Sequence, residues 1–338
     1  MNKKGVLLVN LGTPDSTAVP DVRKYLREFL MDKRVIDIPL VFRWLLVNLI
    51  IAPFRAPKSA AEYRKLFTER GSPLKYYTHD LQGLLQQALG EDYQVEFAMR
   101  YQSPSIEDGL NRLRKAKTSS IHVIPLFPQY ASATTGSVVD KVMEIVKDWQ
   151  VIPELTFTSQ FFEEELFTDT IANQGKHLMA KSHYDHFVFS YHGLPERQIH
   201  KASADNYCTL GDCCSVLNEN NRYCYRAQCM ATTRLIAKKL NLATDQYTVC
   251  FQSRLGKDPW VKPYTEEVLK ELADQGVKKV LAFSPAFVSD CLETTIEVGE
   301  TYQEAFIHAG GEQWDLVPSL NVDPTWVACL KALVERES

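Results

Sequence analysis

The chain lacks several features that would assign it to common protein classes. Its 338 residues carry 38 Lys and Arg against 42 Asp and Glu, so it has no basic excess of the kind that binds nucleic acid. No apolar run reaches the roughly twenty residues of a membrane-spanning helix. The apolar stretch near the start is too short for a secretory leader, and Asn10, Gly12 and Pro14 interrupt it. We therefore expect a cytoplasmic globular protein with no nucleic acid among its partners.

Cysteine pairs two residues apart, which are typical of zinc sites, are also absent, although the chain has eight cysteines. Five of them lie within a short segment: Cys208, Cys213, Cys214, Cys224 and Cys229. In a cytoplasmic protein such crowding indicates metal ligands or buried thiols rather than disulfides. An iron–sulfur cluster, zinc and free regulatory thiols all remain open, and four thiolates suit the first best. Cys250 and Cys329 lie in apolar segments and are expected in the core.

What the chain does contain is a regular alternation of short apolar runs and amphipathic segments. The runs predict strands at 6–9, 95–99, 121–125, 187–191, 248–251 and 279–283. The amphipathic segments between them predict helices at 80–89, 105–117, 138–149, 231–240 and 266–275. Strands that alternate with helices favour an α/β fold with doubly wound, Rossmann-like parallel sheets.

A weak internal repeat suggests how the chain is divided. Residues 121–137 and 279–295 each read as an apolar strand, a proline, an aromatic residue and a polar turn before a helix. Any two strand–helix units look somewhat alike, but two similar lobes facing a central cleft would also explain it. A polar, acidic stretch near 158–170 interrupts the pattern. We therefore predict an N-terminal lobe at 1–165 and a C-terminal lobe, ending in a helix, at 166–338.

The apolar run at 186–191 ends at His192, which Gly193 and Pro195 follow in a turn. A buried strand in an α/β protein brings its carboxyl end to the ligand crevice. A histidine there is suited to exchange protons near neutral pH. The alternative is a histidine that only hydrogen-bonds a loop.

Acidic residues follow the last predicted strand at helical spacing. If Asp290 caps a helix, one face carries the carboxylates of Glu293, Glu297, Glu300 and Glu304. Such a row is either a solvated acidic face or a path for a divalent cation, with crowded carboxylates that pass protons.

Residues 38–54 form a mostly apolar run that Arg43 and Asn48 interrupt. We expect it not to span a membrane. It is either a core helix or an exposed apolar lip that touches a bilayer or an apolar ligand.

Eight motifs in order along nearly the whole chain resemble the ferrochelatase family, whose members insert ferrous iron into a porphyrin. They are LVNLGTP (8–14), APFRAPKSAAEYRKL (52–66), GSPL (71–74), MRYQSPSIEDGL (99–110), PLFPQYASATTGS (125–137), FSYHGLPER (189–197), FQSRLGKDPWVKPYTEE (251–267) and SPAFVSDCLET (284–294). The resemblance implies the two-lobed chelatase fold and makes 38–54 the lip around the porphyrin mouth.

The resemblance also implies roles for individual residues. His192 and Glu293 match the catalytic histidine and glutamate, and Glu297 matches the next acid on an inner helix with a widened turn. These three would also meet the substrate iron. Arg55 and Arg100 match basic residues near the porphyrin propionates, and Leu11 matches a position facing the metal from the other side. Tyr130 and Trp260 are candidates to pack on the ring, although core packing is the commoner role of such residues.

Two positions depart from the family pattern. Cys291 stands where many members have histidine, and a thiol is a poorer proton carrier at neutral pH but a softer ligand. Thr301 stands where the family often has a third acid, with Glu300 beside it. The first departure puts in doubt any mechanism that needs a second histidine. The second suggests that the path of acidic residues is bent or shorter than in the family.

The expected function is insertion of Fe²⁺ into protoporphyrin IX, with release of two protons, as the last step of haem biosynthesis. Coproporphyrin III is the alternative substrate, and a non-catalytic haem- or metal-binding sensor is the alternative function. Some family members carry a [2Fe–2S] cluster, which the insertion at 205–229 would bind through Cys208, Cys213, Cys224 and Cys229, or through Cys214 in place of Cys213. The family resemblance is compatible with peripheral contact between residues 38–54 and the inner face of the membrane. It is also compatible with a homodimer.

Overall fold

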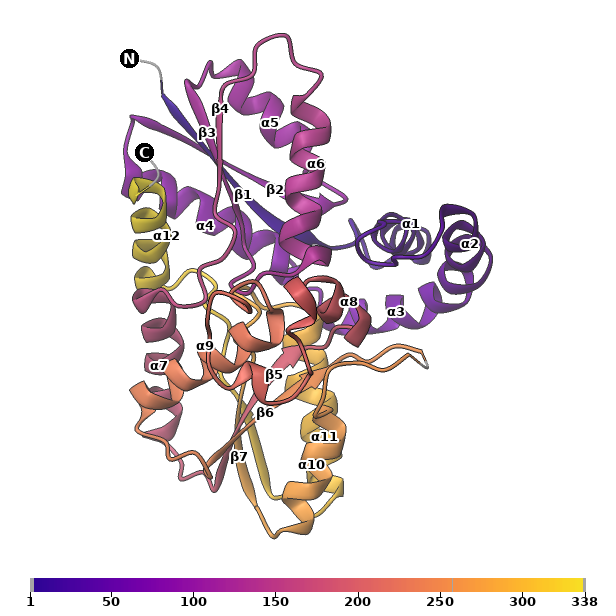
Figure 1. Cartoon of the computed structure of the whole chain (residues 1–338), viewed down its shortest axis with the longest axis vertical. Coiled ribbons are helices and arrows are strands. Elements are labelled where there is room, and N and C mark those ends of the chain that lie inside the picture. The colour runs from indigo at the N-terminus through magenta and orange to yellow at the C-terminus, as the bar shows by residue number, and fades with distance from the viewer. Residues whose placement is uncertain (1–2, 257, 337–338) are drawn as a thin grey trace. The chain divides into compact units, whose positions relative to one another are not determined.

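The computed structural model describes residues 3–256 and 258–336 and has an α/β architecture (Figure 1). Its eight main strands form two four-stranded sheets, both entirely parallel. All six predicted strands are present, and the structure adds two short strands, β4 (Glu154–Phe157) and β8 (Gln313–Leu316). Only four residues long, β4 and β8 form the edges of their sheets, which explains why apolar periodicity did not predict them.

The chain divides into two compact units. The first contains the chain up to Phe127, then Ser132–Gln160, and the chain from Val327 onward. The second contains Pro128–Ala131 and Phe161–Trp326. This division differs from the predicted lobes 1–165 and 166–338 mainly at the end, where most of α12 (Pro324–Arg336) belongs with the first unit.

The first unit has the strand order β2-β1-β3-β4. Its remaining strands are β1 (Lys4–Gly12), β2 (Tyr93–Tyr101) and β3 (Ser120–Pro125). The helices are α1 (Val19–Leu30), α2 (Leu40–Leu45), η1 (Leu46–Ile51), α3 (Ala52–Leu66), α4 (Pro73–Leu89), α5 (Ile106–Lys115), η2 (Ser132–Gly136) and α6 (Ser137–Val146). Here η1 and η2 are π-helical segments.

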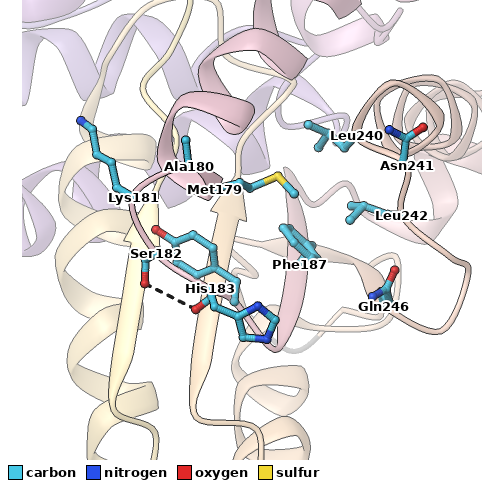
Figure 2. Close-up of a pocket in the computed structure, with 11 residues that line it drawn as sticks. Met179, Ala180, Lys181, Ser182, His183, Phe187, Leu240, Asn241, Leu242 and Gln246 are labelled. Carbon is cyan, nitrogen blue, oxygen red and sulfur yellow. Dashed lines mark hydrogen bonds between the residues drawn. The ribbon is translucent and has the colours of Figure 1, made fainter.

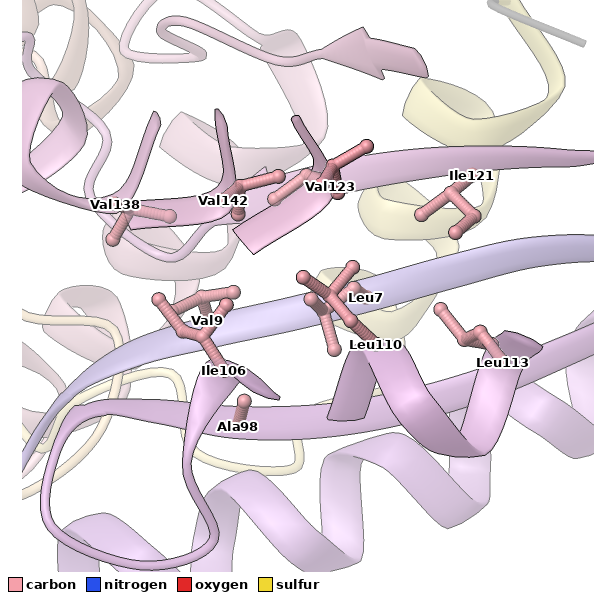
Figure 3. Packing of buried hydrophobic residues seen from close by; sticks show 11 residues of the cluster. Leu7, Val9, Ala98, Ile106, Leu110, Leu113, Ile121, Val123, Val138 and Val142 are labelled. Atoms are coloured by element: carbon pink, nitrogen blue, oxygen red, sulfur yellow. The ribbon is translucent and has the colours of Figure 1, made fainter. Parts of the chain in front are cut away.

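Apolar side chains of β1, β2 and β3 pack against α5 and α6 to form the core of the first unit (Figure 3). The strands contribute Leu7, Val9 and Ala98, all fully buried, and the helices contribute Leu110 and Val142, also fully buried. Strands covered by helices on their faces need apolar residues on both sides, and β1 accordingly buries Val6, Leu7, Leu8 and Val9 in succession.

The second unit repeats this topology with the order β6-β5-β7-β8. Its remaining strands are β5 (His186–His192), β6 (Tyr247–Gln252) and β7 (Lys279–Phe283). The helices are α7 (Glu165–Met179), α8 (Glu196–Lys201), the short 3₁₀ turns η3 (Ala204–Asn206) and η4 (Asp212–Cys214), α9 (Tyr225–Leu240), α10 (Thr265–Asp274), the π-helix η5 (Leu292–Thr301) and α11 (Tyr302–His308). In both sheets the order reverses beside the first strand, where α/β proteins bind ligands.

The internal repeat is therefore real, and the structure adds one feature to it. In each unit the third strand leads through a proline-containing turn into a π-helical segment, η2 after β3 and η5 after β7. Segments of π-helix are rare and are frequently found at functional sites. This places the expected widened turn at η5, on the helix that carries Glu293 and Glu297.

The apolar run at 38–54 is the first part of a longer continuous helix. Within the described residues one helix, Leu40–Leu66, is long and apolar enough to cross a membrane, with a window of mean hydropathy 1.4 that is 22% buried. Our expectation that the run is too short and too interrupted was wrong on length. Arg43 is buried and donates to the carbonyls of Ile36 and Ile38, and Asn48 donates to the Trp44 carbonyl, so neither residue breaks the helix.

The two faces of this helix differ sharply. One face is buried, and its small residues Ala52, Ala56 and Ala60 let α3 approach α1, where the Tyr25 and Tyr63 rings meet edge to face. The other face exposes an apolar lip, formed by Leu40, Val41, Phe42, Trp44, Leu45, Leu49, Ile50 and Phe54. An amphipathic helix with one face packed on its own unit is typical of a surface helix.

Candidate active site

His192 is the last residue of β5, and its imidazole is held by the following residue. The ring Nδ1 lies 2.7 Å from the Gly193 carbonyl oxygen. Because a carbonyl only accepts hydrogen bonds, Nδ1 carries the proton and Nε2 keeps its lone pair free to accept one. The ring is partly exposed, so this lone pair is accessible. His192 therefore has the tautomer that a general base needs.

Gly193 is required by the close packing around the histidine. A Cβ at this position would lie 2.8 Å from the Gln252 carbonyl oxygen and 3.2 Å from Cε3 of Trp260. The Gly193 N–H donates to that same carbonyl at 2.9 Å. Trp260 is largely buried, and its ring centroid lies 6.4 Å from that of His192. The Trp260 side chain therefore packs beside the His192 imidazole and limits the space around it.

Gln252 joins the histidine strand to the acidic helix. It ends β6, where its backbone pairs with His192. Its side-chain amide accepts from Ser190 Oγ at 2.7 Å and donates to the Glu293 carbonyl at 3.0 Å and to Glu297 Oε2 at 3.2 Å. One buried residue thus links the carboxyl end of the sheet to η5, through the Glu293 backbone and the Glu297 carboxylate, while the roles predicted for His192, Glu293 and Glu297 stay predictions.

The Glu297 carboxylate is held by three donors. Besides Gln252, Ser253 Oγ donates to Oε2 at 2.6 Å and the Tyr302 hydroxyl donates to Oε1 at 3.0 Å. Ser253 has a positive φ of 67°, which costs energy for a non-glycine residue and persists where the surroundings enforce it. Strain of this kind gathers at functional sites, and here it aims a hydroxyl at the carboxylate.

Cys291, which replaces the family's usual histidine, is fully buried beside Glu293. Burial, followed by the charge of Glu293 and a hydrogen bond to it, raises the pKa of the thiol well above its ordinary value. The neutral thiol therefore donates to the Glu293 carboxylate and orients it. At neutral pH it neither carries protons nor offers a thiolate to a metal.

The expected row of four carboxylates is not one face of the helix. Asp290 does not cap it: Cys291 precedes the first turn, while the Asp290 carboxylate accepts from Ser319 N–H and Asn321 Nδ2. Glu293 and Glu297 are half-buried, whereas Glu300 and Glu304 are exposed. The reason is the π-helical spacing of η5, which rotates later residues away from the face that a regular α-helix would give them.

Comparison with known proteins gives the family of the chain. The family model described as Ferrochelatase matches residues 3–338. A ferrochelatase of Legionella pneumophila (strain Lens) is 44% identical over 335 residues, which cover 99% of both chains. One from Coxiella burnetii (strain Dugway 5J108-111) is 44% identical over 336 residues, covering 99% of this chain and 94% of the relative. The chain belongs to the ferrochelatase family. It is thus a lyase that inserts a metal ion into a porphyrin.

Solved structures support the fold. SirB from Bacillus subtilis with Fe³⁺ has a TM-score of 0.54 at 13% identity, covering 99% of this chain and 95% of SirB. The sirohydrochlorin chelatase SirB from Bacillus subtilis subspecies spizizenii in complex with cobalt has a TM-score of 0.55 at 11% identity, with coverage of 99% and 94%. At such identities the likeness concerns the chelatase fold alone.

The predicted porphyrin contacts of this ferrochelatase-family chain come from both units. In the first, Leu11 is half-buried near the end of β1 and Arg55 is exposed on α3. Arg100 is less free: Nη2 donates to Asp32 at 2.6 Å, and Nε donates to Ser137 Oγ at 2.7 Å. Its predicted contact with a propionate stays a prediction.

In the second unit Tyr130 lies against the cysteine-rich segment. Its ring centroid is 5.6 Å from that of Tyr223, and its N–H donates to Gln228 Oε1 at 2.6 Å. The Tyr130 ring is thus partly covered by Tyr223 of the cysteine-rich segment. Its predicted packing on a porphyrin stays untested, like that of Trp260.

Four cysteines of the ferrochelatase-family insertion gather in one neighbourhood. The Sγ atoms of Cys213 and Cys214 are 3.8 Å apart. Cys208 hydrogen-bonds Cys213, and Cys214 donates to Cys224. Cys229 points elsewhere, because its fully buried thiol hydrogen-bonds the Tyr225 hydroxyl. Among the described residues no group of three or more His, Cys, Asp or Glu is arranged to hold a single metal ion.

The pKa of the Cys224 thiol lies below its ordinary value. A hydrogen bond from Cys214 lowers its pKa, and the N–H groups of Ala227 and Arg226 in the first turn of α9 add to this against the opposing effect of burial. Helix N-termini favour thiolates in this way. By contrast, burial raises the pKa of Cys250 to about 12, and both Cys250 and Cys329 are buried as predicted.

A pocket of about 450 Å³ lies away from these residues, at the amino end of β5 (Figure 2). Met179, Phe187 and Leu240 give it an apolar wall, and Lys181 and His183 lie at its polar side. Because His192 is at the opposite end of the strand, this pocket is separate from the site.

Sequence reasoning missed the residues that hold the site together, namely Gln252, Ser253 and Tyr225. Gln252 and Ser253 directly follow a predicted strand, and polar residues at that position were the available signal. Tyr225 gave no comparable signal, since its contact with His192 joins residues 33 positions apart.

Proposed function

We propose that the chain inserts Fe²⁺ into protoporphyrin IX to form protohaem, with release of two protons, as the last step of haem biosynthesis. The observation that carries this proposal is the His192 imidazole, with Nδ1 fixed as a donor, on the same hydrogen-bonded framework as Glu293 and Glu297. A base beside two carboxylates provides for both parts of the reaction, removal of protons and attraction of a divalent cation.

The residues divide the chemistry as follows. His192 Nε2 accepts a proton from a pyrrole N–H of the bound ring. Glu293, oriented by the Cys291 thiol, meets the incoming Fe²⁺ and takes the second proton. Glu297, fixed in place by its three donors, attracts the cation and passes protons outward. The metal replaces two protons, so the charge of the macrocycle centre is unchanged.

The choice of porphyrin rests on the apolar lip. Its exposed side chains include Phe42 and Phe54, 65% and 80% exposed, and no acid lies among its eight residues. An apolar lip favours the porphyrin with two carboxylates over coproporphyrin III, which has four. The propionates pair with exposed Arg55, and with Arg100 where its remaining donors allow, as charge-assisted hydrogen bonds. Leu11, Tyr130 and Trp260 supply apolar contacts to the ring.

An anaerobic assay of the full chain with ferrous iron tests this function. We expect growth of the haem Soret band with protoporphyrin IX, and at least tenfold lower kcat/KM with coproporphyrin III, because about 1.4 kcal/mol of lost apolar contact changes the ratio tenfold. Faster turnover of coproporphyrin would assign the alternative substrate. Tight haem binding without turnover of either porphyrin would show a non-catalytic sensor and overturn the proposal.

We propose that the thiols of the cysteine-rich segment would hold a [2Fe–2S] cluster. Such a cluster is ligated by four thiolates shared between two irons, and the thiols fit this as two neighbouring pairs, Cys208 with Cys213 and Cys214 with Cys224. The contacts favour these four as ligands over any set that includes Cys229. When bound, the cluster supplies structural cross-linking or sensing, since insertion of Fe²⁺ transfers no electrons.

Iron content and the visible spectrum of freshly purified protein test the cluster. Cys214→Ser is expected to lose the bound iron and the visible bands, because it removes the thiol that joins the two pairs. Cys229→Ser, in the same segment, is the matched control and is expected to keep both. Loss of iron in Cys229→Ser but not in Cys214→Ser would overturn the proposed set of four ligands. Purified parent protein that contains stoichiometric zinc, or no metal, would overturn the proposal of a [2Fe–2S] cluster.

The chain is a cytoplasmic protein that binds peripherally to the inner face of the membrane through the apolar lip. Exposed apolar side chains beside the exposed cations Arg55 and Lys58 suit an interface that contains anionic lipid.

Sedimentation with vesicles of phosphatidylcholine and phosphatidylglycerol tests this contact. Phe54→Asp is expected to lower the bound fraction roughly tenfold or more, because a buried phenylalanine contributes about 1.5–3 kcal/mol. Val151→Asp, which changes an equally exposed apolar residue outside the lip, is the control. Equal loss in both variants, or no vesicle binding by the parent chain, would contradict the proposal, and resistance to alkaline extraction would indicate a spanning helix instead.

A further inference from the structure

The cysteine-rich segment leads directly into a contact with the histidine of the active site. Cys224 immediately precedes α9, and Tyr225 is the first residue of that helix. The Tyr225 hydroxyl donates a 2.9 Å hydrogen bond to the backbone carbonyl oxygen of His192. Tyr225 is buried, with 7% of its surface exposed, so this bond is shielded from competing water.

This bond fixes the peptide plane on which the imidazole depends. The plane between His192 and Gly193 carries a carbonyl that accepts from Tyr225 and an N–H that donates to the Gln252 carbonyl. It is therefore held at both ends. The next carbonyl, that of Gly193, accepts from His192 Nδ1. Rotation of the plane would move this acceptor and change the direction of the Nε2 lone pair.

Further along α9, in its third turn, a second hydroxyl also ties the helix to the end of β5. The hydroxyl oxygens of Tyr191 and Thr233 lie 2.8 Å apart, and both residues are fully buried. Between the two ties lies Cys229, whose thiol shares the Tyr225 hydroxyl. Two hydroxyl contacts thus join the first three turns of α9 to the end of β5, so a shift of this part of the helix would act on the backbone beside His192.

At the other side, the same turn of α9 is joined to the cysteine segment. The Cys224 sulfur accepts from N–H groups of the first turn and hydrogen-bonds Cys214. Arg226 Nη1 donates to the Gly211 carbonyl at 3.1 Å, which adds a second connection to the loop between Cys208 and Cys213. A change in the arrangement of these thiols acts on the turn that carries Tyr225.

We infer that Tyr225 is a positioning residue that transmits the arrangement of the cysteine-rich segment to His192. Through it, the state of the thiols at 208–224 controls how the imidazole is aimed and so regulates metal insertion. The inference concerns regulation of the site described above and rests on the proposed function, but the geometry that carries it does not depend on which porphyrin is used.

The first experiment removes only the hydroxyl, with Tyr225→Phe. We expect kcat for metallation to fall about tenfold while KM for the porphyrin changes less than twofold. The reason is that the substitution disturbs the orientation of the His192 imidazole but leaves the contacts that bind the porphyrin ring. The bound iron of the segment should stay unchanged. Tyr184→Phe is the matched control, since its buried hydroxyl donates to Asp315 in the same unit, and it should leave kcat unaltered. An unchanged kcat in Tyr225→Phe would overturn the inference.

The second experiment reads the position of His192 without activity. The chain has eight histidines, and in ¹⁵N-histidine-labelled protein the ring signals of His192 are identified by their loss in His192→Ala. Cys214→Ser should shift these signals in the parent chain and leave them unmoved in the Tyr225→Phe background. Equal shifts in both backgrounds, or none in the parent, would overturn the coupling.

The two experiments fail separately. If the chain proves not to be a porphyrin metallase, the ring signals still show whether the thiols and His192 are coupled. If Tyr225→Phe does not fold, Cys213→Ser and Cys214→Ser in the parent chain still decide the matter, because unmoved His192 signals in both would overturn it.

Discussion

Replacing His192 with alanine is expected to lower kcat for metal insertion about 10²–10⁴-fold, the usual contribution of a positioned general base. The fall follows because no other described imidazole lies at the carboxyl end of β5, β6 or β7, and the Cys291 thiol stays protonated at neutral pH. Porphyrin binding, measured by fluorescence quenching, should change little, since the substitution removes a base rather than a wall of the site.

Two further measurements make the result specific. His183→Ala, which removes an exposed histidine just before the start of β5, should keep full activity. Added imidazole should restore part of the activity of His192→Ala, because a small base can occupy the space left by the ring. Activity within a fewfold of the parent chain would show that the imidazole is not the base.

Replacing Asp32 with alanine is expected to destabilise the first unit by about 3–5 kcal/mol, because it leaves a buried arginine without its partner. The Asp32 and Arg100 side chains are only 5% and 14% exposed. The same carboxylate also accepts from the Tyr101 hydroxyl at 3.0 Å and from Ser137 Oγ at 2.5 Å. One substitution therefore leaves several buried donors unsatisfied at once.

The pH dependence of this effect has a definite sign. Burial has the largest single effect and raises the pKa of Asp32, but hydrogen bonds from Ser137, the Arg34 N–H and Tyr101 lower it. The Arg100 charge adds to them, so the net pKa lies below the ordinary value of 3.8. A carboxyl with a lowered pKa contributes stability above its unfolded pKa and loses it as pH falls through the folded pKa. The difference between variant and parent should therefore be constant from pH 8 to 5 and shrink below about pH 4.

Equilibrium urea unfolding at several pH values measures this difference. Asp140→Ala is the matched control, since Asp140 also pairs with basic residues, Lys33 and Arg34, but is 39% exposed. An exposed pair contributes only about 0–1 kcal/mol. A cost in Asp32→Ala no larger than in Asp140→Ala would show that the buried pair does not hold the first unit together.

Much of the fold and part of the site could be predicted because they depend on local pattern. The burial of β1, β3 and β5 on both faces produces apolar runs that any reading of periodicity detects. His192 was found because it ends such a run, and the carboxyl end of a parallel strand is where ligands bind. Glu293 and Glu297 were found from the spacing of acids and from the family resemblance.

Other parts depended on backbone geometry that residue spacing does not encode. The π-helical spacing of η5 leaves Glu300 and Glu304 in solvent, whereas α-helical spacing predicted one row of four acids. The continuation of the apolar helix to Leu66 was missed because charged residues, beginning at Arg55, end the apolar run although the backbone stays helical.

The sequence by itself determined the class of fold and the family, and it placed His192 at the end of a buried strand, because these follow from patterns within a few residues and from motifs read in order. Only the tertiary structure decided what holds the base and the acids: Gln252 and Ser253 on Glu297, Tyr225 on the His192 carbonyl, and Asp32 on Arg100. Each of these contacts joins residues 33 to 68 positions apart, and a hydrogen bond over such a separation exists only once the chain has folded.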